Sequence, residues 1–127
     1  MISKVCLKKE FGDFKSIEDR YNEYKNYRLN NQPHLVYTLG STFKNGSNYK
    51  AYELIRGSKA DKLMVNGAKI SEKHANFIIN FNNCCAKDIL ELIENIIKKV
   101  YNINIIKLES EIEIFQSGGL QNEYKKS

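Results

Sequence analysis

The sequence predicts an α+β fold, in which helices pack on a small, mostly antiparallel sheet. Two patterns indicate it. Residues 84–100 carry a wide apolar stripe at helical spacing, whereas residues 77–79 form a short β-branched and aromatic run that enters a turn. A chain of 127 residues, 42% of them apolar, is large enough for a single core. We therefore expect one domain over residues 1–115 and a polar, flexible tail over residues 116–127.

The first third of the chain predicts a strand over residues 2–8 and then a helix. This helix is expected from Ser16, which stands three residues before Asp19 as in a capping box, to about Leu29. Its tyrosines recur at helical spacing and are expected to pack in the core. Pro33 disfavours helical geometry in the residue before it and therefore ends the helix.

The rest of the chain alternates short helices and strands. Residues 51–56 read as a short helix, and residues 63–65 and 77–79 as strands. The long helix over residues 84–100 has Asp88 near its start, in agreement with the helix dipole. Residues 105–108 and 111–115 are expected to form a strand or a strand pair, with the two isoleucines of the second part facing one side and its glutamates the other.

Composition excludes several classes of protein. No run approaches the ~20 apolar residues of a membrane span, and the amino terminus lacks the apolar stretch of a signal peptide. The three cysteines contain no CxxC pair, which argues against a disulfide framework and against a zinc site. We therefore expect a cytoplasmic protein with no metal site and no membrane partner.

The net charge of +5 is concentrated in the middle of the chain, where residues 44–73 hold seven Lys or Arg and three Asp or Glu. Such a patch suits an anionic ligand, either a nucleotide diphosphate or a nucleic acid. Ordinary surface lysines explain it equally well. The sequence carries none of the common RNA-binding motifs, so a nucleic-acid partner is the weaker interpretation.

Two polar residues are candidates for a functional site. Ser41 follows a glycine, which lets a hydroxyl approach a ligand without steric interference. His74 precedes the strand over residues 77–79. The plain alternatives are an ordinary Gly-Ser turn for Ser41 and a turn ahead of a core strand for His74.

Four stretches, taken in order, resemble one enzyme family. RLNNQP (28–33) is similar to its Arg-x-x-x-Gln-Pro, and GSTFKN (40–45) to its Gly-Ser-x-Phe-Lys-Asn-Pro. GAKISEKHANFIIN (67–80) matches its Gly-Ala-x-Val-Ser-x-Lys-His-Ala-Asn-Phe segment, and LESEI (108–112) its Leu-Glu-x-Glu-Val strand. The chain thus resembles the carboxy-terminal, substrate-binding domain of UDP-N-acetylenolpyruvoylglucosamine reductase, the MurB family.

The resemblance implies an oxidoreductase of peptidoglycan synthesis. In that reaction FAD, reduced by NADPH, passes a hydride to the enolpyruvyl group of a UDP-sugar, and UDP-N-acetylmuramate forms. By motif position Ser41 is the proton donor, and Glu111 assists it and stabilises the enol-like intermediate. The plain alternative for Glu111 is a solvated strand position like that of Glu113, and only the motif separates the two. Lys44, Asn45 and His74 match positions that bind the substrate.

The family's flavin-binding portion, which precedes this domain, is missing from the sequence. We therefore expect FAD and NADPH to act in the complete enzyme, and this chain alone to bind neither. A flavin-binding partner domain or subunit would pack against the face carrying Ser41, where Phe43 and Phe115 are expected to be exposed. Whether the chain alone is an enzyme is left open; the alternative is a diverged, stand-alone domain that binds a UDP-sugar or a protein without catalysis.

Two shorter departures from the family pattern lie near the candidate site. Gly46 replaces the proline that closes Gly-Ser-x-Phe-Lys-Asn-Pro. Arg56 and the run Lys59-Ala60-Asp61-Lys62 replace an acidic residue and a Gly-Leu-Lys-Gly turn. Both changes bear on the local backbone and on substrate contacts.

Overall fold

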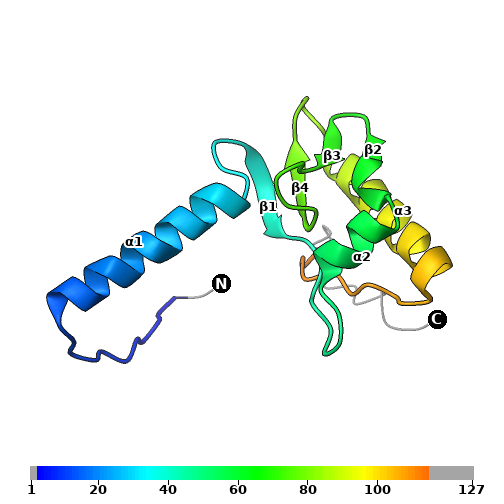
Figure 1. Ribbon diagram of the computed structural model, residues 1–127. Helices are drawn as coiled ribbons and strands as arrows, with labels where there is room; N and C mark the ends of the chain where they lie inside the picture. The colour runs from blue at the N-terminus through cyan, green and yellow to red at the C-terminus, as the bar shows by residue number, and fades with distance from the viewer. Residues whose placement is uncertain (1–2, 115–127) are drawn as a thin grey trace. The chain divides into compact units, whose positions relative to one another are not determined.

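The computed structural model describes residues 3–114. These residues fall into two compact units, and the boundary in the sequence lies between Asn31 and Gln32. In the first unit, residues 3–13 have no regular secondary structure and lead into helix α1 (Phe14–Asn31) (Figure 1). The strand predicted over residues 2–8 is therefore wrong in its described part. A strand needs a neighbouring strand for its backbone hydrogen bonds, and the described residues of this unit provide none.

The helix α1 is present as predicted, but its start and its surroundings differ from the prediction. Asp13 caps it instead of Ser16: Asp13 Oδ2 accepts a 3.0 Å hydrogen bond from the Ser16 backbone N–H. The helix buries none of its residues, and Tyr21, Tyr24 and Tyr27 are 62–66% exposed. The prediction that these tyrosines pack in the core is therefore wrong. Helical spacing shows only that residues share a face of the helix, and not that another element covers that face.

The second unit contains a four-stranded antiparallel sheet with the strand order β1-β4-β3-β2. Its strands are β1 (Tyr37–Ser41), β2 (Met64–Val65), β3 (Ala68–Ile70) and β4 (Phe77–Asn80). The sequence predicted β2 and β4 and missed the other two. Four of the five β1 residues are exposed, because β1 is an edge strand, so it lacks the apolar pattern that identifies a buried strand.

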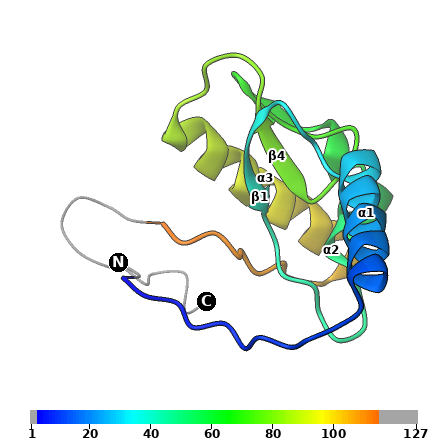
Figure 2. The ribbon, with the colours of Figure 1, turned by 90° about the vertical axis from the view of Figure 1, so that its left-hand side faces the viewer.

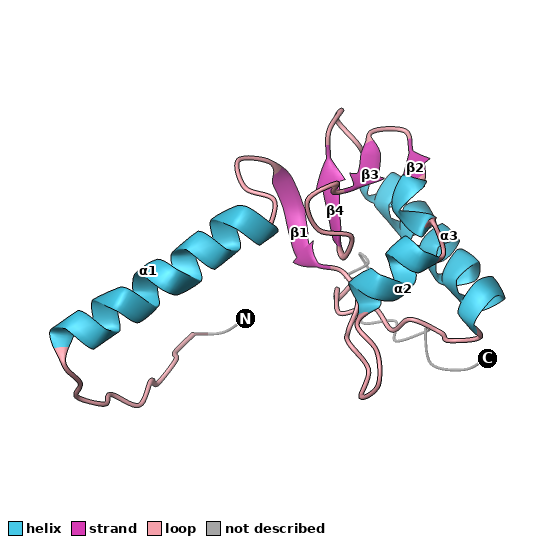
Figure 3. Ribbon diagram, viewed as in Figure 1, coloured by secondary structure: helices cyan, strands magenta, loops and turns pink. Residues whose placement is uncertain are grey.

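Two helices and a 3₁₀ turn pack with this sheet: α2 (Ala51–Gly57), the turn η1 (Ala60–Lys62) and α3 (Ala86–Asn104) (Figure 3). Helix α3 covers one face of the sheet at β2 and β3, and α2 packs against α3 and η1 (Figures 1 and 2). Side chains from all these layers form one core, which includes Phe43, Ile55, Ile70, Ile78, Leu92, Ile96, Val100 and Leu108. The predicted α+β class is confirmed.

Helix α3 begins with a reciprocal capping box between Cys85 and Asp88. The hydrogen bond from the Cys85 backbone N–H, and next the one from the Asn66 side chain, lower the pKa of Asp88. The helix continues past the predicted end at residue 100 and stops at Asn104. There Ile105 adopts a left-handed φ of 57° and donates its N–H to the Tyr101 carbonyl.

Residues 105–114 do not form the strand or strand pair that the sequence predicts. A single antiparallel bridge, between Phe43 and Ser110, is the only β pairing in this segment. Beyond Lys44 the chain reverses in a loop closed by the hydrogen bond from the Gly46 N–H to the Tyr49 carbonyl, so the pairing does not continue. The predicted alternation still holds over residues 111–114, where the glutamates are exposed and the isoleucines half-buried. Phe115 and the predicted tail, residues 116–127, lie outside the described residues, so the division at residue 115 stays a prediction.

Within residues 3–114 no helix combines the length and the apolar character needed to cross a bilayer. Both α1, with 18 residues, and α3, with 19, are long enough, but charged residues recur along each of them.

Candidate functional site

Ser41 ends β1 directly after an irregularity in the sheet. The register of β1 against β4 shifts between Thr38 and Ser41, and Gly40 has a φ of +81°. Residues with a side chain are strained in that conformation. The Ser41 side chain is exposed, and its Oγ accepts a 2.8 Å hydrogen bond from Nδ2 of Asn76. The glycine therefore turns the backbone so that a hydroxyl is presented at the strand end.

The chain after Ser41 is held along both edges. On one edge the Asn76 amide accepts the Phe43 N–H at 2.9 Å and donates to the Phe43 carbonyl at 2.7 Å. On the other edge the Lys44 N–H reaches the carbonyl of residue 109, and the N–H of residue 111 reaches the carbonyl of residue 42. In an extended chain the N–H and C=O of one residue point to the same edge, and successive residues alternate. Phe43 therefore bonds along one edge, while the Thr42 carbonyl and the Lys44 N–H bond along the other. Segments more than 30 residues apart thus fix this stretch.

Phe43 is 1% exposed and packs in the core. The expectation that Phe43 would be exposed at a partner contact is wrong. Its backbone lies between two segments, and its ring belongs to the core that also contains Ile55 of α2 and Leu92 of α3.

Lys44 and two glutamates form a charged group beside this stretch. Lys44 Nζ lies 2.6 Å from Oε1 of Glu109, and both side chains are more than half exposed. This hydrogen bond and the charge of Glu109 raise the pKa of Lys44, and Glu111 adds to the rise. Glu111 is exposed, and its N–H anchors it to the residue after Ser41. Ser41 and Glu111 are therefore neighbours on paired segments, although no hydrogen bond joins their side chains among the described residues.

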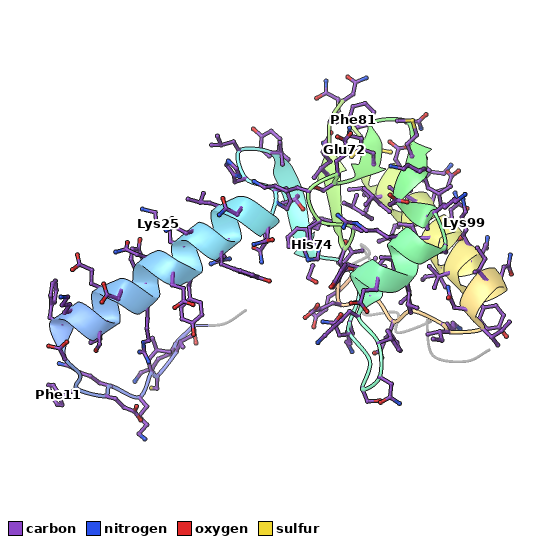
Figure 4. All side chains as sticks on the ribbon, in the orientation of Figure 1. Phe11, Lys25, Glu72, His74, Phe81 and Lys99 are labelled. Carbon is purple, nitrogen blue, oxygen red and sulfur yellow. The ribbon has the colours of Figure 1, made fainter. Side chains whose placement is uncertain are left out.

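His74 lies between the sheet and α2 (Figure 4). Its ring meets Phe77 of β4 edge-on at 4.9 Å and Tyr52 of α2 at 5.5 Å. Burial, and then the positive charge of Arg56, lower the pKa of His74, and both therefore favour the neutral imidazole. Nδ1 accepts a 3.2 Å hydrogen bond from the Asn76 N–H, which leaves the proton on Nε2.

Comparison with known proteins identifies the family to which this arrangement belongs. Residues 32–115 match the family model described as UDP-N-acetylenolpyruvoylglucosamine reductase, C-terminal domain. The reductase of Clostridium perfringens strain SM101 is 33% identical over 114 residues, which are 90% of this chain and 38% of the relative. That of Borrelia garinii subsp. bavariensis is 40% identical over 112 residues, 87% of this chain and 36% of the relative.

A solved structure agrees. The crystal structure of the reductase (MurB) from Thermus caldophilus superposes with a TM-score of 0.61 at 34% identity, over 76% of this chain and 34% of that one. The chain belongs to the UDP-N-acetylenolpyruvoylglucosamine reductase family. It spans little more than a third of the length of the curated relatives that it matches.

The likeness to the reductases is not confined to the carboxy-terminal domain. The alignment with the Clostridium perfringens reductase covers 114 residues of this chain, 30 more than the 84 positions of residues 32–115. The segment 116–127 supplies at most 12 of them, so at least 18 lie within residues 1–31. The unit that contains α1 therefore also corresponds to reductase sequence, outside the matched domain.

Asn45, a substrate-binding position by resemblance to the reductases, has a structural contact in this chain. Its Oδ1 accepts a 2.9 Å hydrogen bond from the N–H of Ala51, the first residue of α2. The Gly46 N–H donates to the Tyr49 carbonyl at 3.2 Å, a bond that a proline could not make. The loop between Lys44 and α2 is thus closed by hydrogen bonds where the reductase pattern has a proline.

The second departure from the reductase pattern also has a defined conformation. Lys59 occupies the left-handed region with a φ of 57° and opens the turn η1.

Hollows among the described residues of this unit lie away from Ser41. One of about 220 Å³ is lined by Arg56, Asp61, Lys62, Ser71, Glu72 and Ala75. Another, of about 280 Å³, is lined by Pro33, His34, Val36, Lys69, Ser71, Glu72, Lys73 and Ile79. Neither includes a predicted site residue, so the hydrogen-bonded group around Ser41 defines the candidate site better than concavity does.

Sequence reasoning missed Asn76, which contacts Ser41, Phe43 and His74 at once. A signal was available, because Asn76 is a polar residue directly before the buried strand β4, and such a residue must find partners. No group of three or more His, Cys, Asp or Glu able to hold a metal occurs within residues 3–114.

Proposed function

We propose that this chain is the substrate-protonating domain of a UDP-N-acetylenolpyruvoylglucosamine reductase. Ser41 donates its hydroxyl proton to the substrate carbon next to the carboxylate, after that group has been reduced to an enol-like anion. The O–H bond breaks, a C–H bond forms, and the electron pair stays on Oγ until water returns a proton. The observation that carries the proposal is the exposed Ser41 hydroxyl, whose oxygen is held by Asn76 while its hydrogen remains available.

The remaining site residues divide into a charged and a neutral group. Glu111 lies on the segment paired with Thr42. There its carboxylate assists Ser41 and stabilises the enol-like intermediate. Lys44 orients Glu111 and Glu109 and, with Asn45, faces the UDP-sugar. His74, neutral with a proton on Nε2, donates a hydrogen bond to a substrate oxygen. These roles follow the family's motif positions.

The residues described here do not fit a dinucleotide cofactor. Phosphates bind where backbone N–H groups at a helix start are open. At α2 the first N–H is bonded to Asn45, and at α3 the Cys85–Asp88 box places a carboxylate where a phosphate would bind. We therefore assign FAD and NADPH to a flavin-binding domain or subunit of the complete enzyme, which acts in peptidoglycan synthesis in the cytoplasm.

The proposal is tested on the full chain by following backbone amide signals in NMR during titration with UDP-N-acetylenolpyruvoylglucosamine. We expect shifts at Ser41, Lys44 and Glu111, and UDP alone should reproduce only part of them. The chain alone should retain no flavin absorbance and consume no NADPH. Absence of any substrate-dependent shift at these residues at millimolar ligand would reject the substrate assignment.

A second candidate function is a stand-alone domain that binds a UDP-sugar or a protein without catalysis. The buried Phe43 favours it, because residues 32–114 complete their own core. The two candidates separate when the chain is combined with the flavin-binding portion of the Clostridium perfringens reductase. Substrate-dependent NADPH oxidation that Ser41→Ala abolishes supports the reductase, whereas ligand shifts without such oxidation support the binding domain.

A further inference from the structure

The side chain of Asn76 makes three hydrogen bonds at the candidate site. It is 4% exposed and precedes β4. Its Nδ2 donates to Ser41 Oγ at 2.8 Å and to the Phe43 carbonyl at 2.7 Å, and its Oδ1 accepts from the Phe43 N–H at 2.9 Å. Its own carbonyl accepts from the Thr42 N–H at 2.8 Å. One residue thus contacts three consecutive residues, beginning with Ser41.

The orientation of the Asn76 amide is determined by these partners. Exchange of its oxygen and nitrogen would place the oxygen against the Phe43 carbonyl and the NH₂ group against the Phe43 N–H. Both hydrogens of Nδ2 are therefore used, one of them on Ser41. The backbone N–H of Asn76 is held in turn by Nδ1 of His74.

This orientation has a consequence for the Ser41 hydroxyl. Because Oγ accepts a hydrogen bond from a group that can only donate, the hydroxyl hydrogen is directed away from Asn76, towards the exposed side of Ser41. When the O–H bond breaks, the negative charge on Oγ faces the same N–H donor. A hydrogen bond to a charged oxygen is about twice as strong as one to a neutral oxygen, so the donor favours the ionised form.

We infer that Asn76 is a positioning residue that orients the Ser41 hydroxyl and raises its acidity. The inference rests on the proposed role of Ser41 as proton donor. Asn76 does not touch the substrate; it acts through Ser41, and the Phe43 hydrogen bonds keep its amide in place. Proton transfer from Ser41 to carbon then leaves an oxyanion that Nδ2 stabilises until solvent returns the proton.

The acidity of the position can be measured without flavin or substrate. In the full chain carrying Ser41→Cys, the rate of alkylation by iodoacetamide against pH gives the pKa of the introduced thiol. Peptide-resolved mass spectrometry separates it from the exposed Cys6, which serves as the internal reference. We expect a thiol pKa below the ordinary value of about 8.5. Adding Asn76→Leu, which removes the donor without adding charge, should raise it by about one unit and slow alkylation at pH 7 about tenfold.

The control is Asn104→Leu, the same chemical change at an amide that donates to the Val100 carbonyl near the end of α3. It should leave the thiol pKa unchanged. An Asn76→Leu variant that keeps its backbone NMR spectrum, and whose thiol pKa stays within about 0.3 units of that of Ser41→Cys alone, overturns the inference.

A second measurement decides the question if Asn76→Leu does not fold. Ser41→Ala removes the acceptor and leaves the two Phe43 hydrogen bonds intact. The side-chain amide signal of Asn76 should then shift and exchange faster with water, while the Phe43 amide stays protected. An unchanged Asn76 signal would reject the Ser41 contact. Both readouts are independent of UDP-sugar binding, so failure of the inference and failure of the proposed function are distinguishable.

Discussion

The two sides of the candidate site are held by different forces. On the Ser41 side, Asn76 is buried and makes neutral hydrogen bonds of 2.7–2.9 Å. On the Glu111 side, Lys44 and Glu109 form an ion pair whose side chains are 51% and 71% exposed. Buried neutral hydrogen bonds are insensitive to salt, whereas exposed ion pairs are screened. The comparison predicts a rigid proton donor beside an adaptable charged neighbour.

The largest effect on the reaction rate is expected for replacement of the proton donor Ser41. In an enzyme completed with a flavin-binding portion, Ser41→Ala should slow substrate-dependent reoxidation of the flavin by about 10³-fold. Reduction of the flavin by NADPH should be nearly unchanged, because only the second half-reaction uses the hydroxyl. Stopped-flow absorbance separates the two steps. Reoxidation at the unmutated rate would show that Ser41 is not the donor.

The charged side should contribute less to the same step. Glu111→Gln keeps the size and removes the charge, and it should slow reoxidation by about 10²-fold. Glu113→Gln is the matched control, since Glu113 is also exposed and lies two residues further along. Equal effects of the two substitutions would assign Glu111 to the solvated surface.

The buried Asn76 side should contribute more to the free energy of unfolding than the exposed ion pair on the other side. Asn76→Leu leaves the Phe43 N–H and carbonyl without partners and should lower the free energy of unfolding by about 3 kcal/mol. Lys44→Met removes only an exposed ion pair and should change it far less. Urea titrations at low and high salt test both. A salt-dependent loss for Asn76→Leu, or an equal loss for Lys44→Met, would contradict the comparison.

The smallest expected effect concerns pH. The folded-state pKa of His74 lies below its unfolded value of about 6.5, so the unfolded chain binds the proton more tightly. This contribution to stability is complete above about pH 6.5 and is lost as the pH falls through the unfolded pKa towards the folded one. His74→Gln should flatten the stability profile between about pH 7.5 and 5.5. The control is replacement of the exposed His34, which should leave the pH dependence due to His74 in place. A steeper dependence of stability on pH in His74→Gln would show that the pKa of His74 is not lowered by folding.

How much of the fold was predictable depended on local pattern. Helix α3 and strand β4 have dense apolar signals and were both predicted. β1 was missed because an edge strand with exposed residues shows no alternation, and β3 because three residues are too few. The strands predicted after α3 failed over residues 105–114 because pairing requires a partner, and within the described part of the chain only Phe43 provides one.

The site shows the same division. Ser41, Lys44 and Glu111 were located by motif position, and the structure brings their segments side by side. Asn45 and His74 were singled out as ligand contacts, yet each also holds backbone of its own unit. Asn76 was not singled out, because its value lies in contacts with residues 33–35 positions away.

The sequence by itself determined the family, the apolar faces of the helices and the residue types available to the site. Those properties are local, because they depend on residue identity and on spacing within one segment. Only the tertiary structure decided that Phe43 is buried, that α1 buries none of its residues and that Asn76 holds the Ser41 hydroxyl. The physical reason is that burial and hydrogen bonding are properties of pairs, and the partners here lie far apart along the chain.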